Sequence, residues 1–87
     1  MKAVYLRPYC VACTVDIEYS EIDFLKFIAC DVVVTKFNDL VVVSEFEAEL
    51  KNLSPCTIIN GVQFYGDVLI IKRSDIDDAV LRFESLF

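Results

Sequence analysis

Residues 31–44 read DVVVTKFNDLVVVS, with β-branched runs on either side of Asn38 and Asp39. Valine and threonine fit the pleated surface of a sheet better than they fit a helix. Asn and Asp tolerate the positive φ of a two-residue hairpin turn. The stretch therefore predicts two antiparallel strands, at residues 31–37 and 40–44, joined by a tight turn.

Five further strands are predicted around this hairpin. Residues 2–7 form the first, which ends at Pro8 because proline cannot donate a hydrogen bond to a ladder. Residues 14–18 alternate apolar and polar side chains and should pair with it. Residues 57–60, 62–65 and 68–73 complete the set, with Gly66 either a turn or a bulge within one longer strand.

Two helices are predicted as well. The first begins at Ser20, a good N-cap, and runs to about Ala29. Phe24 and Phe27 lie off its apolar stripe, so part of this helix is expected to face a partner. Ser74 is the expected N-cap of the second helix, which starts with aspartates that favour the positive helix end.

With Gly66 as a bulge within one longer strand, the order is strand, strand, helix, four strands and helix, which predicts an α+β fold. We expect a small mixed, mostly antiparallel sheet with two helices packed on it. The 87 residues suffice for one core, so residues 1–87 are predicted to form a single domain. The chain has no apolar run near the ~20 residues that span a bilayer and no signal peptide, which predicts a cytoplasmic protein without membrane contact.

Four cysteines raise the question of a metal site. Cys10 and Cys13 form a Cys-x-x-Cys pair, and Cys30 and Cys56 follow singly. The chain direction through the predicted elements brings all four to one end of the sheet. Four thiolates are typical of structural zinc, so one bound Zn²⁺ is predicted. Two alternatives stay open, namely plain burial of the thiols and a redox role.

Composition argues against catalysis. The chain has no histidine, which removes the commonest general base and the usual partner of a Ser or Cys nucleophile. It also lacks a phosphate-cradling or dinucleotide motif. The net charge of −6 opposes direct DNA binding and favours a basic protein partner. A non-enzymatic binding protein is therefore predicted.

Two acidic clusters are predicted to steer that partner electrostatically, with ordinary solubility as the alternative. Tyrosine buries a large area while keeping a polar tip, so tyrosines are the expected anchors. The acidic clusters are Glu45, Glu47 and Glu49, and Asp75, Asp77 and Asp78; the tyrosines are Tyr5, Tyr9, Tyr19 and, as the first choice, Tyr65.

The order of elements, the Leu53-Ser54-Pro55 segment and the Gly66-Asp67 segment resemble a family of small phage and mobile-element proteins of uncharacterised function. The cysteines of the chain depart from the pattern of that phage family. The chain is also similar to zinc-containing anti-CRISPR inhibitors of type II RNA-guided nucleases. The resemblance implies a phage-encoded counter-defence protein that binds a basic, nucleic-acid-handling nuclease and blocks its engagement of target DNA. The alternative is a structural or regulatory interaction module, monomeric or homodimeric.

Overall fold

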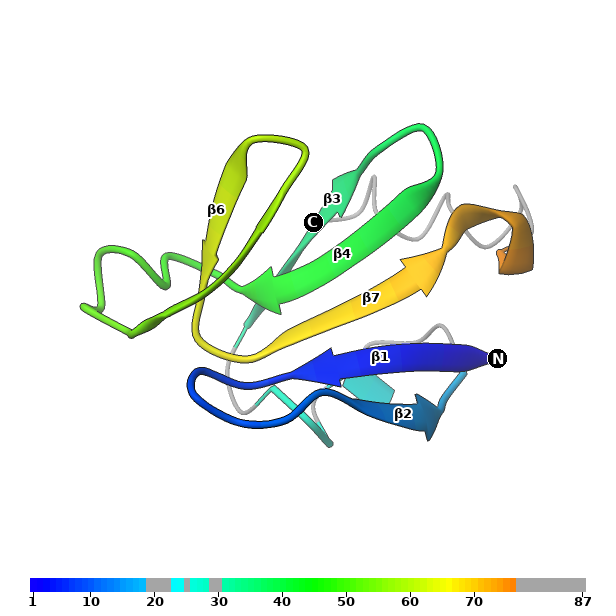
Figure 1. Ribbon diagram of the computed structural model, residues 1–87, viewed down its shortest axis with the longest axis horizontal. Coiled ribbons are helices and arrows are strands. Elements are labelled where there is room, and N and C mark those ends of the chain that lie inside the picture. Colours follow the sequence, from blue (N-terminus) through cyan, green and yellow to red (C-terminus); the bar gives the residue numbers. More distant parts are fainter. Residues whose placement is uncertain (19–22, 25, 29–30, 77–87) are drawn as a thin grey trace.

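The computed structural model describes residues 1–18, 23–24, 26–28 and 31–76, and strands take up 49% of them. The described chain is therefore mostly β (Figure 1). All seven predicted strands are present, with ends shifted by at most a few residues. They are β1 (Lys2–Leu6), β2 (Cys13–Asp16), β3 (Val32–Lys36), β4 (Leu40–Glu45), β5 (Pro55–Ile59), β6 (Val62–Tyr65) and β7 (Val68–Lys72).

The strands form two antiparallel sheets, so the prediction of one mixed sheet was wrong. The larger sheet has the order β2-β1-β7-β4-β3, and the smaller one is the β5–β6 hairpin. Every pair is antiparallel. Gly66 lies in the turn between β6 and β7, which belong to different sheets, so it is not a bulge within one strand.

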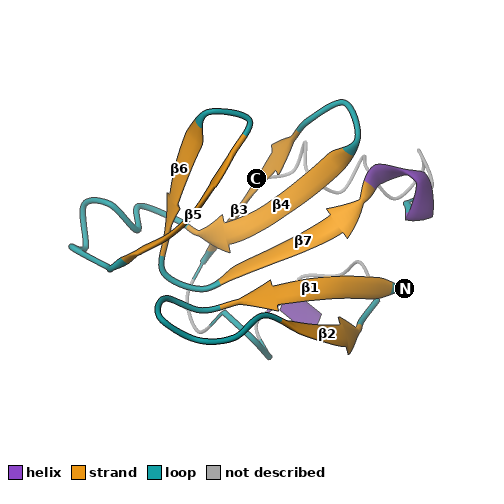
Figure 2. Cartoon of the chain, in the orientation of Figure 1, coloured by secondary structure: helices purple, strands orange, loops and turns teal. Residues whose placement is uncertain are grey.

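The prediction of an α+β fold with two packed helices was also wrong. Among the described residues the one complete helix is a 3₁₀ turn, η1 (Arg73–Asp75), shown in purple in Figure 2. Its N-cap is Lys72 rather than Ser74, and Ile76 is already extended (φ −113°, ψ 125°). None of the described helical residues forms a segment that is long and apolar enough to cross a membrane.

Only part of the first predicted helix lies within the described residues. Asp23 and Phe24 are helical, and Ile28 N–H donates to the Phe24 carbonyl at 2.9 Å, which is one helical turn. Phe24 is fully buried in the core, which contradicts its assignment to a partner-facing surface. Positions 20–22, 25 and 29 of the first predicted helix, and residues 77–87, where the second was predicted to continue, lie outside the described residues.

The β3–β4 hairpin confirms the interpretation of residues 31–44. Val34 lies opposite Val43, and Phe37 N–H closes the turn by donating to the Leu40 carbonyl at 2.8 Å. Asn38 and Asp39 make this turn without positive φ. Positive φ occurs instead in the β5–β6 turn, at Asn60 (49°) and Gly61 (79°), the pattern of a type I′ hairpin.

The larger sheet is covered on both faces. Val41, Val42 and Val43 are consecutive residues of β4, so they alternate between the faces, yet all three are fully buried. Val41 and Val43 join a core that includes Phe24 and Ile28, whereas Val42 packs with Phe64 and Val68 beneath the β5–β6 hairpin. The sheet is thus a fixed platform for the loops at its ends.

Candidate interaction site

Several connections meet at one end of the larger sheet, here called the loop end. Antiparallel pairing places Leu6 opposite Val68, and Val68 opposite Ser44. Phe46 N–H donates to the Asp31 carbonyl at 2.8 Å, which adds the start of β3. The loop end therefore comprises residues 7–12, Asp31, residues 46–54 with Glu45, and Gly66-Asp67, at the left in Figure 1.

The negative charge of the described residues is concentrated at the loop end. This end carries two basic and five acidic side chains, a net charge of −3: Arg7 and Lys51 against Asp31, Glu45, Glu47, Glu49 and Asp67. At the other described positions, five basic and five acidic side chains cancel. A positively charged partner would therefore be attracted to this end of the molecule.

Large apolar side chains are exposed at the same end. Tyr9 and Val11, in the β1–β2 connection, are each 91% exposed. Leu50 is 78% exposed and Phe46 47% exposed in the β4–β5 connection. A concentration of exposed apolar side chains in one region is a feature of surfaces that bind partners.

The β4–β5 connection is ordered by its own hydrogen bonds and stands out from the sheets (Figure 1). Lys51 N–H donates to the Glu47 carbonyl at 3.0 Å, and Leu53 N–H donates to the Ala48 carbonyl at 3.2 Å. Ala48 is buried at 7% exposure and anchors the segment. The loop therefore holds Phe46 and Leu50 in defined positions.

Gly66 seats this segment against the sheet. Its N–H donates to the Ser54 carbonyl at 2.9 Å, and its φ is +71°. A Cβ at this position would lie 2.8 Å from Leu53 Cδ1. The positive φ therefore favours glycine here, and a larger residue would have to displace Leu53 Cδ1.

Three loop-end residues other than glycine occupy a backbone conformation that L-residues rarely adopt. Tyr9 has φ 62°, and Glu47 and Asn52 each have φ 56°. Tyr9 follows Pro8 in a turn that Cys10 N–H closes by donating to the Arg7 carbonyl at 3.1 Å, and the third position of such a turn favours glycine. A bulky exposed residue kept in this conformation costs folding free energy, which points to a use outside folding.

Tyr5 joins three segments behind the loop end. Its hydroxyl donates to Asp67 Oδ2 at 3.0 Å and lies 3.3 Å from the Phe27 carbonyl oxygen. The Phe27 ring centroid is 5.2 Å away, and Arg7 Cζ lies 5.5 Å from the centre of the Tyr5 ring. Burial, followed by the hydrogen bond to Asp67, raises the pKa of Tyr5 to about 12. This tyrosine is thus structural rather than a free anchor.

The structure brings together some of the predicted partner-binding residues and separates others. Glu45, Glu47 and Glu49 lie at the loop end, and Tyr65 lies next to Gly66 on the hairpin face opposite the buried Phe64. Asp75 is exposed at the opposite end, beyond β7. Asp75 therefore lies apart from the three glutamates, and Asp77, Asp78 and Tyr19 lie outside the described residues, so partner binding by these residues stays a prediction.

The cysteines are only partly described. Cys10, in the β1–β2 connection, and Cys13, the first residue of β2, are exposed free thiols. Cys56, on β5, is a half-buried free thiol. Within the described ranges, no three His, Cys, Asp or Glu side chains are grouped to hold a metal ion. Cys30 lies outside these ranges, so zinc binding by Cys10, Cys13, Cys30 and Cys56 stays a prediction.

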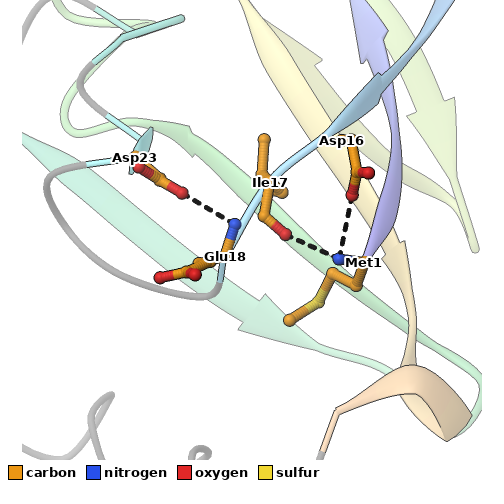
Figure 3. Close-up of polar contacts among 5 residues, drawn as sticks. All are labelled: Met1, Asp16, Ile17, Glu18 and Asp23. Carbon is orange, nitrogen blue, oxygen red and sulfur yellow. Dashed lines mark hydrogen bonds and ion pairs between the residues drawn. The ribbon is translucent and has the colours of Figure 1, made fainter.

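A polar depression lies at the opposite end of the sheet, and Figure 3 shows the polar contacts among residues that line it. The Met1 ammonium donates to Asp16 Oδ1 at 3.1 Å and to the Ile17 carbonyl at 2.8 Å. Asp23 Oδ2 accepts from the Glu18 N–H at 2.7 Å, and Asp23 Oδ1 pairs with Lys26 at 2.9 Å. These contacts lower the pKa of Asp16 and of Asp23, so neither carboxyl is suited to act as a general acid.

Sequence reasoning named Tyr9 as an expected anchor but missed the other exposed apolar residues of the loop end, Val11, Phe46 and Leu50. Glu45 to Leu50 alternates three glutamates with Phe46, Ala48 and Leu50. That interleaving is the available signal, because acidic residues alone fit any solvated loop. No family model, curated protein or solved structure matches the chain.

Proposed function

We propose that the chain is a non-enzymatic protein-binding domain that uses its loop end to occupy a basic surface of another protein. The observation that carries the proposal is the coincidence of excess negative charge with exposed apolar side chains at one end of the sheet. Charge steers a partner to this end, and burial of Tyr9, Val11 and Leu50 would slow its dissociation.

The target class follows from the resemblance noted above. A phage-encoded inhibitor of a type II RNA-guided nuclease would meet a strongly basic nucleic-acid channel in the bacterial cytoplasm. A domain with an acidic, apolar-tipped end could bind in that channel and exclude target DNA. Its net charge of −6 offers little counterion release on DNA, so it would compete with DNA and not bind it.

The test is target-DNA cleavage by a panel of guide-loaded type II nucleases, with and without the protein, together with size-exclusion chromatography of each mixture. We expect inhibition of at least one nuclease and a stable complex with it. Absence of both across the panel would reject this target class and favour the interaction-module alternative. The mass of the free protein in the same runs distinguishes a monomer from a homodimer.

A matched pair of variants tests the site. The double substitution Glu47→Lys, Glu49→Lys changes the loop end, whereas Asp39→Lys, Asp75→Lys makes the same charge change at exposed positions of the opposite end. Inhibition should be lost in the Glu47→Lys, Glu49→Lys variant and kept in the Asp39→Lys, Asp75→Lys variant. Equal loss in both would show that net charge, and not the loop end, determines binding.

A further inference from the structure

We propose that Cys10 and Cys13 form a reversible dithiol–disulfide site at the loop end, which takes small-molecule disulfides as its oxidant. Both thiols are free and exposed. The inference rests on the placement of these thiols and does not depend on the proposed function.

Backbone contacts hold both cysteines in place, whereas no packing constrains the two residues between them. Cys13 lies opposite Tyr5 in the β1–β2 ladder, and Cys10 N–H donates to the Arg7 carbonyl at 3.1 Å. Val11 is 91% exposed and Ala12 is exposed as well. Movement of these two residues would therefore break no buried contact of their side chains.

The spacing of Cys10 and Cys13 along the chain is compatible with a disulfide between them. A four-residue turn brings its first and last Cα atoms within about 7 Å, which is close to the upper limit of the Cα separation in a disulfide. Cys10 and Cys13 have this four-residue spacing, and Val11 and Ala12 between them have no regular secondary structure. A bridge between them therefore needs only a local turn, with β1 and β2 left paired.

The third described thiol is a poor competitor. Cys56 is half-buried and packs beside the core of Val42, Phe64 and Val68. Burial beside this core shields the Cys56 sulfur from an oxidant in solution, whereas the Cys10 and Cys13 thiols are exposed. Oxidation should therefore favour the exposed pair.

The reaction is two successive thiol–disulfide exchanges. One protein thiolate attacks glutathione disulfide, which forms a mixed disulfide and releases one glutathione thiolate. The second protein thiolate attacks the protein sulfur of that mixed disulfide and releases the second glutathione. Overall, the protein loses two hydrogens and one glutathione disulfide becomes two glutathiones, which carry those two protons.

The test uses the intact, metal-stripped protein with glutathione disulfide, followed by acid quenching, alkylation of free thiols and trypsin digestion. Cleavage after Lys and Arg, with the Arg7-Pro8 bond spared, separates residues 3–26 from residues 27–36 and 52–72. The first peptide holds Cys10 and Cys13, and the others hold Cys30 and Cys56 respectively. We expect peptide 3–26 to lose about 2 Da and both alkyl labels, and to regain both labels after dithiothreitol treatment.

Two variants serve as controls. Cys13→Ser should leave Cys10 as a stable glutathione adduct, about 305 Da heavier, because no second thiol can displace the glutathione. Cys56→Ser should leave the behaviour of peptide 3–26 unchanged. The proposal is overturned if wild-type peptide 3–26 keeps both labels, retains glutathione, or becomes linked to one of the other cysteine peptides.

Discussion

The two ends of the larger sheet differ in net charge and in the exposure of large apolar side chains. At the opposite end, polar groups bind partners within the chain: the Met1 ammonium contacts Asp16, and Arg73 Nη1 donates to the Phe37 carbonyl at 2.8 Å. At the loop end, acidic side chains exceed basic ones, and Tyr9 and Leu50 remain exposed. One sheet therefore supports an end whose charges cancel among the described residues and an end that keeps a net charge of −3 together with exposed apolar side chains.

A pair of leucines gives the largest expected difference. Leu69 is fully buried in the core and Leu50 is 78% exposed at the loop end. Leu69→Ala should lower the free energy of unfolding by about 2–5 kcal/mol because it leaves a cavity. Leu50→Ala should change it by less than about 0.5 kcal/mol.

Urea unfolding of the two variants measures both effects under the same conditions. A loss for Leu50→Ala comparable to that for Leu69→Ala would mean that Leu50 is needed for folding. The assignment of the loop end as a contact surface would then fail.

The two glycines give a smaller difference. Gly66 and Gly61 both have positive φ, but only Gly66 has a neighbour within 4 Å of a Cβ. Gly61→Ala should cost about 1–2 kcal/mol from backbone strain alone. Gly66→Ala should cost about 0.5 kcal/mol beyond that, because the added methyl group also displaces the end of the Leu53 side chain. Equal losses in thermal unfolding of the two variants would show that residues 46–54 are not seated on Gly66.

Tyr9→Gly should stabilise the free protein. The substitution removes an exposed side chain from a residue with φ 62°, so it relieves strain without exposing any core. After the greater flexibility of glycine in the unfolded chain is subtracted, a gain of about 0.5–1 kcal/mol is expected. The matched substitution Tyr65→Gly, within β6, should destabilise instead. A destabilised Tyr9→Gly protein would contradict the view that Tyr9 is kept for contact with a partner.

The two ends should lose their contributions to folding stability at opposite extremes of pH. At the opposite end, the pKa of Asp16 is lowered mainly by its hydrogen bond with the N-terminal ammonium, and that of Asp23 mainly by its hydrogen bond with Lys26. Their contribution to stability is present above the ordinary pKa of 3.8 and is lost as pH falls below it.

Behind the loop end, the pKa of Tyr5 rises from 10.0 to about 12 on folding, mainly through burial. Its contribution is intact below pH 10 and is lost as pH rises from 10 to 12. Melting temperatures across the pH range should therefore show a shallower acid limb for Asp16→Asn and a shallower alkaline limb for Tyr5→Phe. An alkaline limb that is unchanged in Tyr5→Phe would show that the Tyr5 hydroxyl does not control it.

The strands were predictable because β-branched runs and alternation mark them locally, as in residues 31–44. Their division into two sheets was not, since pairing between β1 and β7 joins segments more than 60 positions apart and leaves no local pattern. The second helix was predicted from Ser74 and the aspartates after it. Those residues favour a helix end, but the extended backbone at Ile76 shows that local capping preference did not decide the conformation there.

The candidate site was predictable in charge but not in extent. The glutamates at positions 45, 47 and 49 are visible in the sequence, and their common location follows from it. The exposure of Tyr9 and Val11 beside them depends on which end of the sheet each loop reaches, and this requires the strand order. The same strand order separates Asp75 from the other acidic residues.

The central claim is that the loop end alone receives a basic partner, and the association rate with an inhibited nuclease tests it most directly. The rate should be measured at low and moderate salt for wild type, for Glu47→Lys with Glu49→Lys, and for Asp39→Lys with Asp75→Lys. We expect the loop-end pair to slow association about tenfold or more, with a weaker dependence on salt. The opposite-end pair should stay within about threefold of wild type. Equal slowing by both pairs, or slowing by the opposite-end pair alone, would contradict the account.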